Sequence, residues 1–168
     1  MTMTVVVWIV EGSWPACVDA AATLAPADAD IVLLHVTAEE IPAAAHGAYA
    51  GLLGRGHPER DPGRRVEELA ATSTEDLLSV AAQRLARPST RLLRPGRPER
   101  EVLDVAQTAQ LLIVARDGDR VRLGPKSLGK ASRFIVDHAP CPVLLVWPQP
   151  APGVGTIPPT PPRPPHHR

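Results

Sequence analysis

The sequence predicts an α/β protein with an open parallel five-stranded sheet and helices on both faces, giving three layers. Uniformly apolar runs alternate with amphipathic runs along the chain, as they do in successive βαβ units. The apolar runs are rich in Val, Ile and Leu, which is typical of strands buried on both faces. Only 3% of the 168 residues are aromatic, so aliphatic side chains must fill the core.

The first predicted strand is Val5–Val10, a β-branched apolar run that would lie near the centre of the sheet. Glu11-Gly12-Ser13 ends it. Ser13 is placed to cap the next helix, and Pro15 suits a first helical turn. We therefore expect a helix over Trp14–Leu24.

The second predicted strand is Ile31–Val36, again buried. We expect its His35 to be a hydrogen-bonded core or rim residue rather than a catalytic one. Residues 37–64 are long, irregular and rich in glycine, and a loop of this length is either a functional lid or a mobile excursion. His46 and His57 within it show no metal-ligand spacing with either cysteine.

The third strand and its two flanking helices follow. Val66–Leu85 has apolar residues at helical spacing. Arg91–Leu93 is a short strand, expected at a sheet edge because it carries arginine, and Pro98–Ala109 is the next predicted helix. Arginines recur every three or four residues but cross several elements, so they cannot form one helical stripe: Arg84, Arg87, Arg91, Arg94, Arg97 and Arg100.

The last βαβ unit is the most informative stretch. The apolar run Leu111–Ala115 ends in a charged glycine loop, an amphipathic run Lys130–His138 follows, and Val143–Trp147 is the final strand. In such a unit the loop feeds the helix N-terminus, where backbone N–H groups and the helix dipole favour an anion. The charges agree with an anion site, because residues 84–133 carry 12 Lys and Arg against 5 Asp and Glu.

Composition changes sharply after Trp147. Residues 148–168 hold nine of the 20 prolines, so they should form neither ladders nor helices. We expect one domain over residues 1–147 and a disordered or polyproline-like tail over 148–168. The tail would serve as a solubilising linker or as a ligand for a proline-binding partner protein.

Several function classes are disfavoured. The net charge is zero and no aromatic residues interleave with the arginines, so we expect neither nucleic acid nor membrane as a partner. Cys17 and Cys141 suggest neither a disulfide framework nor a metal site. There is no G-x-S-x-G elbow and no intact P-loop, so we expect no enzyme, although slow ATP hydrolysis stays open. Without a signal peptide or spanning segment, the expected location is cytoplasmic.

Four short motifs stand at the ends of the predicted elements. They are Val10-Glu11-Gly12-Ser13, Leu34-His35-Val36, Gly96-Arg97-Pro98-Glu99 and His138-Ala139-Pro140-Cys141-Pro142-Val143. Together with the order of elements they resemble the universal stress protein family, over about residues 4–147. That resemblance implies a parallel sheet of strand order 3-2-1-4-5, frequent homodimers paired through the last strand (here Val143–Trp147), and ATP binding in one subclass. An exposed apolar edge strand is an aggregation hazard that such pairing would remove.

The nucleotide-binding subclass has Gly, two residues, Gly, nine residues, Gly, then Ser or Thr. The matching span is Ala115, two residues, Gly118, ten residues, Gly129 and Lys130. Alanine adds a methyl group where the backbone would approach a ligand. Lys130 replaces a hydroxyl, and a lysine point charge also binds phosphate. Gly118 and Gly129 are read equally well as plain turn and cap glycines.

Two functions follow. One is a regulatory protein that binds ATP or another adenine nucleotide at the carboxyl ends of strands one and four, with no metal beyond a nucleotide-bound magnesium. The other is a dimeric protein-interaction module without nucleotide. The nucleotide-site residues implied are Glu11, Gly12, Ser13, Val36, Ala115, Gly118, Gly129 and Lys130.

Overall fold

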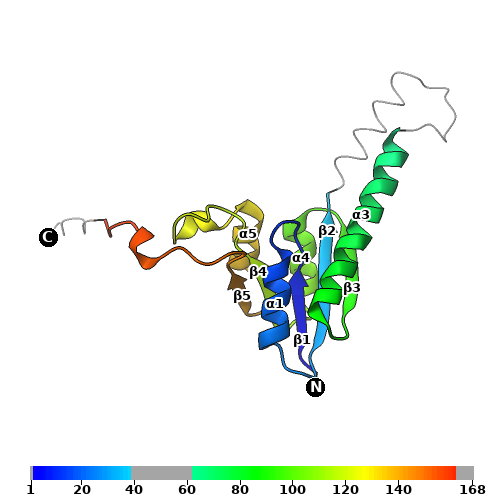
Figure 1. The fold of residues 1–168 in the computed structure, drawn as a ribbon, viewed down its shortest axis with the longest axis horizontal. Coiled ribbons are helices and arrows are strands. Elements are labelled where there is room, and N and C mark those ends of the chain that lie inside the picture. Colours follow the sequence, from blue (N-terminus) through cyan, green and yellow to red (C-terminus); the bar gives the residue numbers. More distant parts are fainter. Residues whose placement is uncertain (1, 39–61, 162–168) are drawn as a thin grey trace.

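A parallel five-stranded sheet forms the centre of the structure (Figure 1). The computed structural model describes residues 2–38 and 62–161. The strand order is β3-β2-β1-β4-β5, which confirms the predicted 3-2-1-4-5 sheet. The strands are β1 (Thr4–Trp8), β2 (Asp30–Thr37), β3 (Thr90–Pro95), β4 (Leu111–Ala115) and β5 (Val143–Val146).

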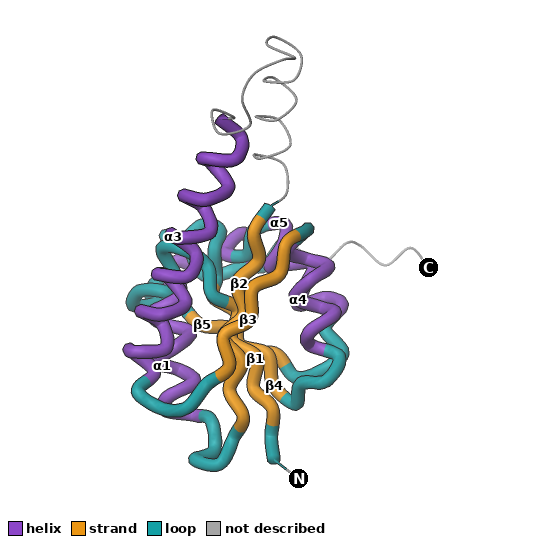
Figure 2. The backbone as a smooth tube through the Cα atoms, turned by 90° about the vertical axis from the view of Figure 1, so that its right-hand side faces the viewer, coloured by secondary structure: helices purple, strands orange, loops and turns teal. Residues whose placement is uncertain are grey.

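Helices cover both faces of the sheet. Figure 2 shows α1 (Trp14–Leu24) and α3 (Pro62–Leu85) on one side and α4 (Pro98–Ala106) on the other, where α5 (Lys130–His138) also packs. Side chains alternate along a strand, so Val5 and Val7 enter the core beneath α1, whereas Val6 enters the core beneath α4. Both faces are buried, which explains why the central strands are uniformly apolar.

Some element ends differ from the prediction. β1 stops at Trp8 rather than Val10, because the carbonyl of Val10 already accepts the turn amides of Ser13 and Trp14. α3 begins at Pro62 rather than Val66, and α4 ends at Ala106 rather than Ala109. β3 lies at the sheet edge, as its arginines predicted. Most of the expected loop 37–64, including His46 and His57, lies outside the described residues.

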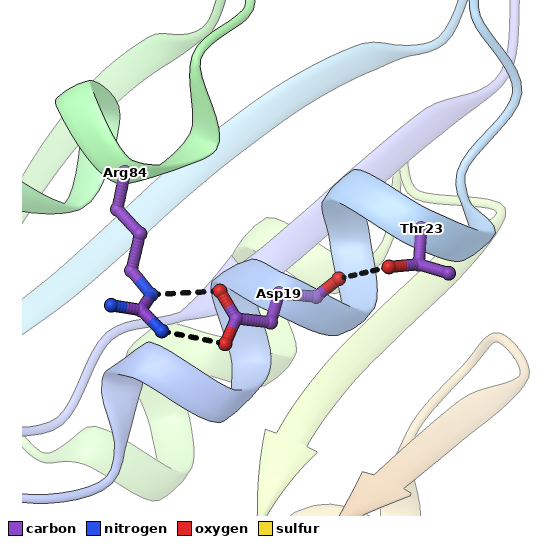
Figure 3. Close-up of polar contacts among 3 residues, drawn as sticks. All are labelled: Asp19, Thr23 and Arg84. Atoms are coloured by element: carbon purple, nitrogen blue, oxygen red, sulfur yellow. Dashed lines mark hydrogen bonds and ion pairs between the residues drawn. The ribbon is translucent and has the colours of Figure 1, made fainter.

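Three of the recurring arginines serve the fold. Arg84 on α3 donates two hydrogen bonds, of 2.7 and 2.8 Å, to the carboxylate of Asp19 on α1, and so ties the two helices together (Figure 3). Arg87 donates to the carbonyls of Pro26 and Ala27, in the turn between α1 and β2. Arg94 of β3 lies 3.9 Å from Asp104 of α4. These cations are therefore not assembled at one anion site.

The tail contains a turn that the sequence did not predict. Val154–Thr156 forms one turn of 3₁₀ helix, since these three residues are free of proline. The Oγ1 of Thr156 accepts the backbone N–H of Leu123 at 3.0 Å and donates to the carbonyl of Gly153. The expectation that the tail forms no helical turn is thus wrong at this point. Within residues 2–38 and 62–161, no helix is long and apolar enough to cross a membrane.

Candidate functional site

The predicted site residues lie along the carboxyl edge of the sheet, on the segments that follow β1 and β4 and at the end of β2. After β1, Glu11 and Gly12 are exposed, and Gly12 has a φ of 82°, a conformation that favours glycine. A Cβ on Gly12 would meet nothing within 4 Å, so the space beside it is open. Ser13 is buried, and its hydroxyl donates to the carbonyl of Val10 at 3.4 Å.

Two expectations at this edge have clear outcomes. Ser13 makes no side-chain hydrogen bond to the first turn of α1, so its predicted capping role is wrong. His35 is half-buried, and its Nδ1 lies 2.7 Å from the carbonyl oxygen of Ile9. Because the partner is a carbonyl, Nδ1 must carry the proton, and the bond ties β2 to the end of β1. This confirms His35 as a hydrogen-bonded rim residue.

Val36 and Ala115 face the interior of the protein. Val36 packs with Trp8 and Leu34 in the core beneath α4, and Ala115 belongs to the core beneath α1. Both side chains are less than 9% exposed. The two residues therefore lie on opposite faces of the sheet, and only their backbone reaches the edge that the prediction assigned to a nucleotide.

The loop after β4 closes on itself through Arg116. Its guanidinium donates to the hydroxyl of Ser127 and lies over the ring of Trp147, 5.0 Å from the centroid. The hydroxyl of Ser127 in turn donates to the carbonyl of Gly124 at 2.6 Å. The Nε of Arg116 is buried without a partner. The side chain of Arg116 thus links the start of the loop to Ser127 near its end and to Trp147 after β5.

The backbone donors of the two motif glycines are already engaged. The N–H of Gly118 donates to the carbonyl of Ser127 at 2.9 Å, and the N–H of Gly129 donates to Oδ1 of Asp117 at 2.7 Å. A Cβ on Gly118 would lie 2.3 Å from the carbonyl oxygen of Lys126, and one on Gly129 would lie 2.8 Å from Oδ2 of Asp117. The close packing of the loop therefore explains by itself why both positions are glycine, without a bound ligand.

Asp117 gives this site its electrostatic character. Gly129 is the residue at the start of α5, where the helix dipole favours a negative charge. The carboxylate of Asp117 supplies that charge. Lys130, the next residue, is exposed, and within the described residues its side chain makes no hydrogen bond. The guanidinium of Arg133 donates a hydrogen bond to the carbonyl of Pro125, so Arg133 also stabilises the loop.

Arg116 and Asp117 belong to the charged glycine loop that the sequence predicts after Leu111–Ala115, but the sequence does not single them out. The missed signal was their position: both directly precede Gly118, and Asp117 stands twelve residues before Gly129. Nothing in the sequence says that the chain returns to bring these residues together. Ser127, which receives Arg116, carried no signal either.

Other chemistry finds little support in the described residues. Burial raises the pKa of the Cys17 thiol to about 12 and also raises the pKa of Cys141, so neither is an activated nucleophile. No group of three or more His, Cys, Asp or Glu in the described part of the chain is placed to hold a metal ion. A cavity of about 470 Å³ lies between β1, β2, β3 and α4, with Val32 and Leu92 among its lining, and it includes none of the predicted site residues.

Comparisons with known proteins agree with this architecture. The model of the universal stress protein family matches residues 1–146. A universal stress protein solved in complex with cAMP is 18% identical, with a TM-score of 0.57, over 88% of this chain and 98% of that one. Universal stress protein UspA from Lactobacillus plantarum is 18% identical, with a TM-score of 0.56, over 86% and 97%.

A third solved structure, that of hypothetical protein MJ0577, is 15% identical with a TM-score of 0.59, over 90% of this chain and 99% of that one. No curated protein matches the sequence significantly. Structural likeness at this level of identity establishes the fold alone, whereas the family match covers most of the sequence. The chain belongs to the universal stress protein family.

Proposed function

We propose that this chain is a universal-stress-type regulatory protein that acts as a dimeric protein-interaction module, and that loop 116–130 is held closed by its own side chains rather than by a nucleotide. One observation carries the proposal: the carboxylate of Asp117 accepts the N–H of Gly129, at 2.7 Å, at the start of α5. A module of this kind carries out no chemical reaction.

Electrostatics explain why this contact opposes a nucleotide. A phosphate at the start of α5 would need the N–H that Asp117 already holds. If both stayed, two negative charges about 4 Å apart would repel by roughly 4 kcal/mol at the effective dielectric constant near a protein surface. If the carboxylate left, its own hydrogen bond would be lost. Either route weakens phosphate binding relative to an unoccupied helix start.

The interaction surface follows from the edge of the sheet. β5 pairs with β4 alone, so its outer backbone groups have no strand partner among the described residues. All four of its residues, Val143–Val146, are apolar and half-buried. Pairing of two copies through Val143–Trp147 would cover this edge across a two-fold axis. Pro148 would limit the length of the ladder.

A second candidate, an adenine nucleotide bound at the same edge, has its own supporting observations. The space beside Gly12 is open, Lys130 is exposed, and the hydroxyl of Ser132 in the first turn of α5 is buried without a partner. A structural neighbour was solved with cAMP. The nucleotide, and any magnesium bound with it, therefore stays a prediction that an experiment must separate from the first proposal.

The experiment is isothermal titration of ATP, ADP, AMP and cAMP into the wild type, Asp117→Ala and Asp119→Ala. Asp119 is the matched control, because its carboxylate accepts the N–H of Val121 within the same loop and does not touch α5. We expect no heat with the wild type or the control, and measurable binding only when Asp117 is removed. Binding to the wild type that Lys130→Ala weakens would instead establish the nucleotide candidate.

Sedimentation of the wild type tests the dimer separately. We expect a dimer in which Val143–Val146 is protected from hydrogen exchange. A monomer at high concentration would contradict the interaction module, whatever the titrations show.

A further inference from the structure

Exposed apolar side chains are frequent on the segments that precede and follow β5 in the chain. Four of the eight large hydrophobic side chains exposed in the described part of the chain belong to the loop after β4, to α5 and to the tail. Val121 is 74% exposed, Phe134 42%, Val154 79% and Ile157 56%. Val121, Val154 and Ile157 lie on two segments that the hydrogen bond from Leu123 to Thr156 holds together. Exposed apolar residues that are brought together mark an interaction site more often than scattered single residues do.

The loop and the tail form one ordered projection, which we call the arm: residues 119–128 together with residues 148–157. The N–H of Leu123 in the loop donates to Oγ1 of Thr156 in the tail. The base of the arm is fixed by Arg116, which stacks on Trp147 and binds Ser127. The arm is thus preorganised, and docking it would cost little additional ordering entropy.

The direction of the arm points to its occupant. In Figure 1 the loop (yellow) and the tail (orange) lie on the same side of the molecule as β5, and the tail runs outward from the body. If two copies pair through β5 across a two-fold axis, the space beyond this edge belongs to the partner. Each arm would then lie over the other copy rather than over its own domain.

The size of the β5 edge argues that a dimer needs the arm. β5 has four residues, so it is about 13 Å long at roughly 3.3 Å per residue. Two strands of that length bury far less than the ~1,200 Å² at the lower limit of stable protein interfaces. Contacts beyond the ladder must supply the remaining area. The tail part of the arm continues the chain from the end of β5 and carries exposed aliphatic side chains that can supply it.

We propose that the arm of each chain packs on a second copy of the same chain, with Val121, Val154 and Ile157 as the apolar contacts. This inference rests on the dimer of the proposed function and adds an exchange of arms to it. The partner is a second copy and not an unrelated protein, because the arm projects from the edge that self-pairing would cover.

The test is sedimentation equilibrium of the full chain and of the double variant Val154→Asp/Ile157→Asp. Leu24→Asp is the control, since Leu24 is similarly exposed at 61% but ends α1, which lies outside the arm. Neither tail residue is buried, so the variant should fold as the wild type does in circular dichroism. We expect the dimer dissociation constant to rise at least tenfold in the arm variant and to stay unchanged in the control.

A cross-linking measurement asks which chain the arm touches. A photoreactive residue at position 154 is activated in a mixture of unlabelled and ¹⁵N-labelled chains, and cross-linked peptides are analysed by mass. Mixed-label peptides support the exchange. A dimer of unchanged affinity whose cross-links join only peptides of one label overturns the arm proposal and leaves the β5 dimer standing. A wild-type chain that stays monomeric overturns both.

Discussion

Replacing Gly118 with alanine tests directly whether the loop after β4 is closed as described. The new Cβ would lie 2.3 Å from the carbonyl oxygen of Lys126 and 2.8 Å from the carbonyl carbon of Ser127. These are backbone atoms, and ordinary contact begins at 3.4 Å, so the two segments would have to separate by about 1 Å. The hydrogen bonds from the amides of Gly118 and Asp119 across the loop would then be strained or lost.

The magnitude follows from these two effects. Overpacking of this kind costs about 1–3 kcal/mol, and two weakened backbone hydrogen bonds add about 0.5–1.5 kcal/mol each. We therefore expect Gly118→Ala to lower the free energy of unfolding by roughly 2–6 kcal/mol. Where the loop opens at a smaller cost, the amide of Asp119 should instead lose its protection from hydrogen exchange.

Urea denaturation and amide exchange measure the two outcomes. Gly153→Ala is the matched control, because a Cβ there meets nothing within 4 Å and its φ of −66° suits alanine. The control should unfold within about 0.5 kcal/mol of the wild type. If Gly118→Ala matched the control in both measurements, the loop would not be closed against Lys126 and Ser127. The argument that the closed loop holds the Asp117 carboxylate at the start of α5 would then fail.

Two further predictions concern charge and thiol chemistry. Hydrogen bonds from Arg84 hold the pKa of Asp19 below its usual value. The pairing of the two side chains therefore stabilises the fold fully at pH values above the pKa of an unfolded Asp, about 3.9. This stabilisation is lost as the pH falls through the lowered pKa of the folded protein. Urea unfolding of wild type and Asp19→Asn should therefore differ slightly at neutral pH and converge in acid; a difference that grew in acid would contradict the pairing. For the thiols, Cys17 should resist alkylation until the protein unfolds, since burial raises its pKa to about 12, whereas the half-buried Cys141 should react first. Mass spectrometry of the labelling time course distinguishes the two, and early labelling of Cys17 would show that the core beneath α1 is open.

The sequence was sufficient for the fold wherever two independent signals coincided. Trp14–Leu24 and Lys130–His138 were bounded correctly because glycine or proline and a change of hydrophobic period fell together at their ends. The end of β1 was not, because Ile9 and Val10 extend the apolar run beyond the last ladder pair with Trp8. Apolar residues indicate burial rather than strand pairing, and Ile9 is buried although the β1–β2 ladder ends at Trp8.

The site was less accessible, for a different reason. Its decisive contacts join Asp117 to Gly129 and Arg116 to Ser127, and each depends on the path of the loop between them. Composition could show that the loop is charged, but it could not pair the charges. The same holds for Arg84 and Asp19, which are 65 residues apart in sequence and meet only because α1 and α3 share one face of the sheet. Contacts between residues so far apart in the chain produce no periodic pattern in the sequence.

Any external anion at the start of α5 would have to compete with the Asp117 carboxylate, which belongs to the same chain. A group fixed on the same chain acts at an effective concentration that is commonly millimolar or higher, and dilution or dialysis does not remove it. A free ligand at micromolar levels would therefore reach only the small fraction of molecules in which the side chain has swung away. The affinity of the α5 start for an anion is therefore set by the fraction of time that the Asp117 carboxylate is away from Gly129. A signal that increased this fraction would raise the affinity without contacting the ligand.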